Sequence, residues 1–167
     1  MPRNRRLTSG TDPNRTSRVA LSDLVCFELY AAARVVARAY RPALSGLGLT
    51  YPQYLVMVML WQDAPRTVKD LGEHLDLDSG TLSPLLKRLE ASGLVTRRRR
   101  TDDERTVEIT PTPKGTALQR DAKRVPIEMA AAMGIPDTEK RELRALLRKV
   151  TTALVAEQDG GVPAPAA

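Results

Sequence analysis

Apolar residues recur at helical spacing along most of the chain. The clearest series is Leu82, Leu85, Leu86 and Leu89, and a later one is Leu143, Leu146, Leu147, Val150 and Leu154. Steps of three and four residues place such side chains on one face of a helix. In the region 94–110, two β-capable runs, LVTRRRR and RTVEIT, flank the polar stretch TDDE. This is the pattern of a hairpin with a polar tip. The sequence therefore predicts a mostly α fold with one small β-hairpin.

Capping residues and helix breakers suggest where the elements begin and end. Ser22 is a candidate N-cap for a long first helix, which two glycines end near residue 47. Thr50, followed by Pro52 in the first turn, starts a second helix that is expected to reach residue 62. Further helices are expected over about residues 67–75, 79–92, 113 onward with a break or kink at Pro126, and 137–157.

Two short helices joined by a tight turn and followed by a hairpin form the order of a winged helix-turn-helix, here over about residues 52–110. The second helix of the pair keeps several polar side chains outside its leucine stripe: Ser79, Thr81, Ser83, Lys87 and Arg88. Hydroxyl groups near the start of such a helix approach base edges and phosphates closely, and the two cations hold the phosphate backbone.

The hairpin carries a run of arginines from Arg97 through Arg99 to Arg100, and Arg105 lies just past its tip. A wing of this kind tracks the DNA backbone and inserts an arginine into a narrow minor groove. One of the nearby acids is expected to pair with an arginine and brace the tip. A solvated edge strand, whose charges block aggregation, is the alternative interpretation of the arginine run taken alone.

Composition limits the other possibilities. The net charge is +6, but five arginines and one aspartate in the first 20 residues account for +4 of it, so the DNA hypothesis rests on individual positions. One cysteine and one histidine exclude a Cys/His zinc cluster and a disulfide framework, and no cofactor is expected. A lone thiol and the lack of a membrane-length apolar run favour a cytoplasmic protein. Residues 1–18 and 158–167 read as disordered tails around a domain at 19–157.

The chain resembles the MarR family of dimeric winged-helix regulators over about residues 20–157, and within it the organic-hydroperoxide-sensing (OhrR-type) branch. The matching stretches are LVCFELYAAARVVARAYRP, LGLTYPQYLVMVMLW, LDSGTLSPLLKRLEASGLV and DDERTVEIT. The resemblance implies a homodimer formed by helices at about 20–47 and 113–157, with two tyrosines, Tyr40 and Tyr51, reaching across it to a reactive Cys26. Tyr30 would lie close by. Asp103 and Arg105 match the family's wing motif, which implies bracing and a minor-groove contact.

Helical spacing gives a separate check on the thiol site. Tyr30 follows Cys26 by four residues and shares its face. Tyr40 follows by fourteen, which is about 21 Å along a straight helix, so Tyr40 can meet only the Cys26 of a second, antiparallel copy. Phenol donors at that place would stabilise a thiolate. The simpler interpretation is that Cys26 is a small buried hydrophobe and that the tyrosines only pack.

The sequence therefore predicts a repressor, not an enzyme, that releases its DNA operator when an organic hydroperoxide oxidises Cys26. No second cysteine is available to form a disulfide, so a low-molecular-weight thiol or over-oxidation must complete the switch. Three alternatives stay open: a regulator on the same scaffold that responds to a lipophilic or phenolic ligand, a thiol peroxidase, and an architectural DNA binder.

Overall fold

The computed structural model describes residues 20–159. The expected tail at 1–18, and the expected tail beyond residue 159, lie outside the described residues. The chain divides into two units, residues 1–39 and 40–167, and each is described by itself.

The first described element is a short 3-10 helix, η1 (Leu21–Asp23), and the long helix α1 (Val25–Ser45) follows it. The expected start of the first α-helix at Ser22 was wrong. A backbone hydrogen bond closes the η1 turn, because the Asp23 amide donates to the Ala20 carbonyl at 2.9 Å. Leu24 is then extended, at φ −92° and ψ 105°, and separates η1 from α1. Cys26 is therefore the second residue of α1 and lies in its first turn.

The second unit is built around α2 (Tyr51–Gln62), whose bounds match the prediction. Its start is a capping box, in which the Thr50 amide donates to Gln53 Oε1 at 2.8 Å. Tyr54, Val56, Met57 and Leu60 of α2 are buried. The helix is consequently apolar around most of its circumference, as a central core helix must be.

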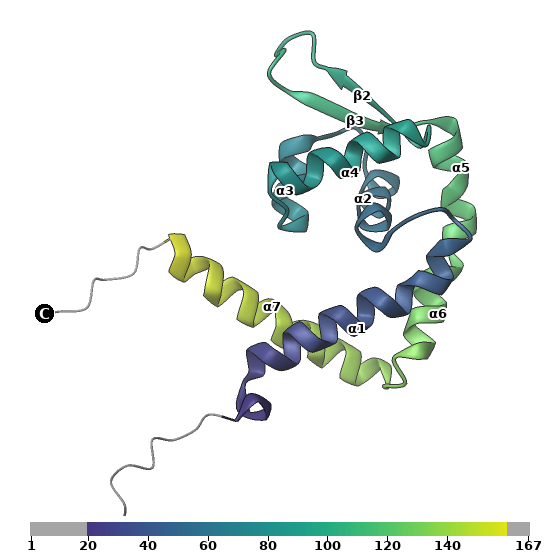
Figure 1. The fold of residues 1–167 in the computed structure, drawn as a ribbon. Helices are drawn as coiled ribbons and strands as arrows, with labels where there is room; N and C mark the ends of the chain where they lie inside the picture. The colour runs from purple at the N-terminus through teal and green to yellow at the C-terminus, as the bar shows by residue number, and fades with distance from the viewer. Residues whose placement is uncertain (1–19, 160–167) are drawn as a thin grey trace, which may run out of the picture. The chain divides into compact units, whose positions relative to one another are not determined.

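The helix-turn-helix consists of α3 (Val68–Leu75) and α4 (Ser79–Ala91). Between them the backbone turns at Asp76, which has a φ of 50°. The predicted leucine stripe is confirmed, since Leu82, Leu85, Leu86 and Leu89 of α4 are all buried. Figure 1 shows α3 and α4 side by side, with the hairpin beyond them.

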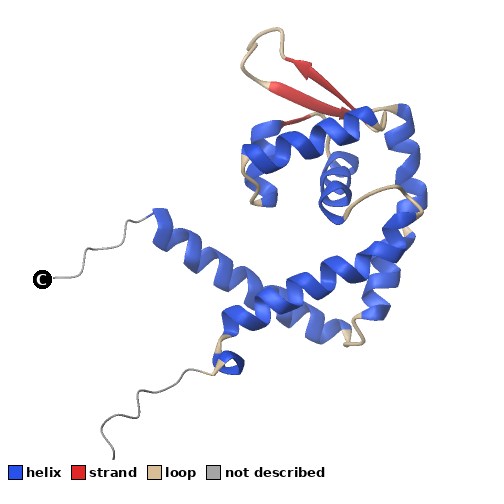
Figure 2. Ribbon diagram, in the orientation of Figure 1, coloured by secondary structure: helices blue, strands red, loops and turns tan. Residues whose placement is uncertain are grey.

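The predicted hairpin forms from β2 (Val95–Arg99) and β3 (Val107–Pro111), which pair antiparallel with Arg97 opposite Ile109. The sequence patterns missed a third strand, β1 (Arg66–Thr67), which pairs with the other edge of β3. Two residues are too few to show any alternation. The sheet has the order β1-β3-β2 and is drawn in red in Figure 2. The fold is thus mostly helical with a small sheet, as predicted.

Three helices complete the chain: α5 (Pro113–Ala122), α6 (Arg124–Ala132) and α7 (Asp137–Asp159). The expected break at Pro126 occurs earlier, at Lys123. Pro126 instead occupies the first turn of α6, where no amide hydrogen is needed. None of the described helices is both long and apolar enough to cross a membrane.

Candidate functional site

Helix α4 presents its polar face as the sequence suggests. Ser79, Thr81, Lys87 and Arg88 are exposed and Ser83 is half-buried. Asp78 caps the helix: it accepts from the Thr81 amide at 2.8 Å and from the Thr81 hydroxyl at 2.9 Å. These hydrogen bonds lower the pKa of Asp78. The first turn of α4 is thereby fixed, with its hydroxyl groups facing outward.

The wing tip is braced by its acids. Asp102 accepts two hydrogen bonds from Arg100, at 2.8 and 2.6 Å, and this pairing lowers the pKa of Asp102 to about 2. Asp103 accepts from the Thr106 hydroxyl at 2.6 Å and from the Arg105 amide at 3.1 Å. Both carboxylates therefore have hydrogen-bond partners within the wing itself. Among the described residues, no ion pair engages the guanidinium of Arg105.

A cationic groove of about 580 Å³ opens between the helix pair and the wing. Its polar lining consists of Thr67, Lys69, Ser83, Arg97, Arg100, Arg105 and Thr106. Arg97 lies opposite the buried Ile109, which directs it to the helix side of the sheet. Its Nε is buried and finds no hydrogen-bond partner within residues 20–159. A groove that combines four cations with an unpartnered guanidinium nitrogen suits a phosphate group.

Of the four cations in that groove, Lys69 was not expected from the sequence, whereas Arg97, Arg100 and Arg105 belong to the predicted wing. The only local signal at Lys69 is a positive charge in the first turn of a helix, where it opposes the helix dipole. Arg99, which was expected to contact DNA, is exposed, and its Nη1 donates to the Glu104 carbonyl at 3.3 Å.

The structure brings Tyr40 and Tyr51 together, with ring centroids 4.3 Å apart. Tyr54 joins them at 5.9 Å from Tyr40. Burial raises the pKa of all three phenols above 10.0, and the neighbouring phenols add to the rise at Tyr40 and Tyr54. Phenols with a raised pKa stay protonated near neutral pH, so these hydroxyl groups are available as hydrogen-bond donors. Tyr54 was missed in the sequence, although it follows Tyr51 by one helical turn.

Cys26 and Tyr30 belong to the other unit and are described apart from this cluster. Cys26 is an exposed free thiol, and Tyr30 is 58% exposed. Arg34 Nη1 donates to the Tyr30 hydroxyl at 2.7 Å, and its guanidinium lies 5.4 Å from the ring centroid. Because Tyr30 accepts from Arg34, its own hydroxyl hydrogen is free for another acceptor.

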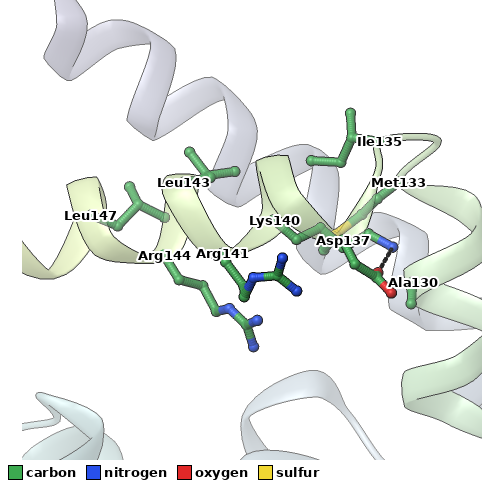
Figure 3. A pocket seen from close by; sticks show the side chains of 9 residues that line it. All are labelled: Ala130, Met133, Ile135, Asp137, Lys140, Arg141, Leu143, Arg144 and Leu147. Atoms are coloured by element: carbon green, nitrogen blue, oxygen red, sulfur yellow. Dashed lines mark hydrogen bonds and ion pairs between the residues drawn. The ribbon is translucent and has the colours of Figure 1, made fainter.

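A second groove, of about 530 Å³, runs along α6 and α7 (Figure 3). Its apolar lining is Ala130, Met133, Ile135, Leu143 and Leu147. Lys140, Arg141 and Arg144 add three cations, and Lys140 pairs with Asp137 at 3.2 Å. Within residues 20–159, no group of three or more His, Cys, Asp or Glu side chains is placed to hold a metal ion.

Comparison with known proteins agrees with this architecture. A sequence model of the MarR family matches residues 49–107. The organic hydroperoxide resistance transcriptional regulator of Bacillus subtilis is 40% identical over 141 residues, 84% of this chain and 94% of that protein. The regulator TtmR of Methylorubrum extorquens is 45% identical over 148 residues, 89% of this chain and 75% of that protein.

A similar fold is found in reduced AbfR bound to DNA, a Staphylococcus epidermidis protein. That structure has a TM-score of 0.68 and 37% identity, and the match covers 81% of this chain and 94% of that one. These relatives are named as regulators, and none is named as an enzyme. The chain therefore belongs to the MarR family of DNA-binding transcriptional regulators.

Proposed function

We propose that the protein is a homodimeric repressor that senses organic hydroperoxides by oxidation of Cys26 and then releases its operator. The observation that carries this proposal is the pair of protonated phenols, Tyr40 and Tyr51, whose ring centroids lie 4.3 Å apart with the rings tilted by 33°. Two adjacent donors of this kind suit a thiolate better than they suit a neutral side chain. The similarity to a regulator of organic hydroperoxide resistance supports the same function.

The thiol chemistry balances without an internal partner. The Cys26 thiolate attacks the outer, hydroxyl-bearing oxygen of the peroxide, so that a sulfur–oxygen bond forms and the oxygen–oxygen bond breaks. The alkoxide leaves and takes up a proton from solvent to become the alcohol. The sulfur loses two electrons and becomes a sulfenic acid. A small thiol then condenses with it, which forms a disulfide and expels water. Cys26 is well placed for this attack, because it is exposed and lies in the first turn of α1.

The proposed site needs a second copy of the chain, and α7 carries a suitable surface. The exposed apolar side chains of this helix are Leu143, Leu146, Leu147, Val150, Leu154 and Val155. The spacing of the first five places them along one face, where a partner helix would cover them, and Val155 lies beside that face. In a dimer of this kind two α4 helices enter successive major grooves about 34 Å apart.

On this proposal, the polar face of α4 reads the operator and the wing holds its backbone. Arg97 and its groove seat a phosphate, while Arg105 reaches into the minor groove. Adding a thiol adduct to Cys26 removes the acceptor from the tyrosines and adds bulk between the two copies. The spacing of the two α4 helices then no longer fits the operator.

Operator binding by the wild type and by Cys26→Ser, titrated with cumene hydroperoxide and L-cysteine, tests the proposal. We expect the wild type to release DNA and the variant to stay bound. Mass spectrometry should show one cysteine adduct per released chain. Because an overoxidized AbfR has been solved bound to DNA, the adduct and the sulfonic acid must be counted separately.

Cumyl alcohol provides the matched control, since it has the shape of the peroxide without its reactive bond. The proposal would be contradicted if the alcohol made the wild type release its operator, or if the peroxide made Cys26→Ser release it. Such a result would favour a ligand-released repressor, for which the groove of Figure 3 is the specific support. Its apolar lining and three cations suit a lipophilic anion.

A further inference from the structure

The aromatic cluster extends beyond the two tyrosines of the proposed sensing site. Tyr54 lies 5.9 Å from Tyr40 and 6.4 Å from Trp61, which it meets edge to face at 67°. Tyr54 is only 6% exposed. Tyr54 and Trp61 are seven residues apart on α2, so they share one face of that helix. The rings of Tyr51, Tyr40, Tyr54 and Trp61 therefore form a continuous series, called here the aromatic ladder.

The far end of the aromatic ladder is attached to α5. Trp61 Nε1 donates to the Gly115 carbonyl at 2.8 Å. Gly115 is buried against the Leu94 backbone so closely that a Cβ at this position would collide with the Leu94 carbonyl oxygen. Trp61 thus holds a residue of α5 that packs directly against the backbone of Leu94.

Leu94 directly precedes β2, the first strand of the wing. Its carbonyl accepts from the Thr112 amide at 3.0 Å, and the Thr112 hydroxyl donates to the Gly93 carbonyl at 2.7 Å. Thr112 also caps α5, since its hydroxyl accepts from the Gly115 amide at 3.0 Å. The start of α5 and the base of the wing are consequently held as one piece.

We propose that Tyr54 and Trp61 are positioning residues that couple the Tyr40–Tyr51 pair to the base of the wing. The proposal rests on the proposed function, in which the tyrosine pair responds to oxidation of Cys26. Tyr54 is buried between Tyr40 and Trp61, which are half-buried, so a shift of one ring meets close packing at Tyr54 and displaces its neighbour. A displacement of Tyr40 is therefore passed through Tyr54 and Trp61 to Gly115 and Leu94, and it tilts the wing away from DNA.

The test compares operator affinity before and after oxidation by cumene hydroperoxide with L-cysteine, in Tyr54→Phe, Tyr54→Leu and Leu55→Ala. Tyr54→Phe keeps the ring, and Tyr54→Leu removes it. Leu55→Ala removes half-buried packing from the same helix outside the aromatic ladder. The quantity of interest is the ratio of the two affinities, since a merely structural defect weakens both forms alike.

We expect Tyr54→Leu to lower this ratio by about tenfold, with reduced-form affinity within about threefold of the wild type. Mass spectrometry should show Cys26 oxidised to the wild-type extent. Tyr54→Phe and Leu55→Ala should keep the wild-type ratio. Trp61 is the only tryptophan, so its emission should change on oxidation of the wild type and stay constant in Tyr54→Leu.

If Tyr54→Leu keeps the wild-type ratio of operator affinities while Cys26 is fully oxidised, the coupling is overturned and the sensing function is left intact. Failure of the sensing function has a different signature, namely that Cys26→Ser releases its operator when peroxide is added. If Tyr54→Leu does not fold, Trp61→Phe replaces it, because that change keeps an aromatic ring and removes the indole N–H that donates to Gly115. A wild-type ratio in Trp61→Phe with complete oxidation of Cys26 would then overturn the coupling. If Tyr54→Leu does fold, equal loss in Trp61→Phe and in the double variant with Tyr54→Leu would place both residues on one route, and additive losses would refute it.

Discussion

At the residue scale, Arg105 shows how one side chain is freed for recognition. The acids around it are already occupied: Asp102 by Arg100, and Asp103 by the Thr106 hydroxyl and the Arg105 amide. Asp103 thus fixes the backbone of Arg105 without neutralising its guanidinium. The acids at the tip therefore hold the backbone in place and leave the Arg105 guanidinium without an ion pair among the described residues.

Arg105→Ala should weaken operator binding by about 1–3 kcal/mol if the side chain enters a groove. Arg98→Ala is the matched control, because Arg98 has the same charge and lies opposite Glu108 on the same hairpin. We expect the control to change affinity much less, and neither change to alter the melting temperature. Fluorescence anisotropy with operator and scrambled DNA measures both. Equal losses for the two variants would remove Arg105 from the interface.

At the scale of elements, the sequence patterns located what depends on local spacing. The α2 bounds, the buried leucine face of α4 and the hairpin all follow from caps, periodicity and alternation. The start of α1 could not be located in this way, because the η1 turn competes with the helix for the same residues. Strand β1 could not be predicted, since its pairing with β3 depends on a partner more than 40 residues away in sequence.

The same distinction applies to the sites. Tyr40 and Tyr51 were identified by resemblance, and their stacking required the folded chain. Tyr54 and Lys69 have no local pattern that separates them from ordinary packing or solvated charges. Their roles arise from groups that are brought together by tertiary structure, so only the fold reveals them.

The wing as an element should be insensitive to pH across the physiological range. The pKa of Asp102 is about 2 in the fold against 3.8 for a free side chain. A depressed pKa stabilises the folded form above the unfolded value, and the contribution is lost as pH falls through the folded one. The Arg100 Nε–H resonance should therefore hold its position above about pH 4 and shift as pH falls toward 2.

Asp102→Asn serves as the comparison for this titration, because it keeps the size of the side chain and removes its charge. The resonance in this variant should start shifted at neutral pH and show no acid transition. A midpoint near 4 in the wild type would mean that the bidentate pair does not hold in solution.

At the scale of the whole molecule, α7 provides the most direct test of dimerisation. Leu154 is 52% exposed, so a charge there costs the single chain little. We expect Leu154→Glu to shift the protein toward monomer and to lower operator affinity by more than about tenfold, because two linked half-sites become one. Thr152→Glu adds the same charge to the opposite face of the helix and should stay dimeric. Light scattering after size exclusion measures the mass, and a dimeric Leu154→Glu would exclude this face from the interface.

The uncovered face of α7 has a consequence for the newly made chain. The leucines of this face are exposed among the described residues, and an exposed apolar face is a surface on which unfolded neighbours and aggregates can form. In the proposed dimer, which would cover this face, finding a second copy is the last step of maturation and not a later association between finished molecules. The resistance of the protein to heat should accordingly rise with its own concentration, because the pair, and not the single chain, is the thermodynamically complete unit.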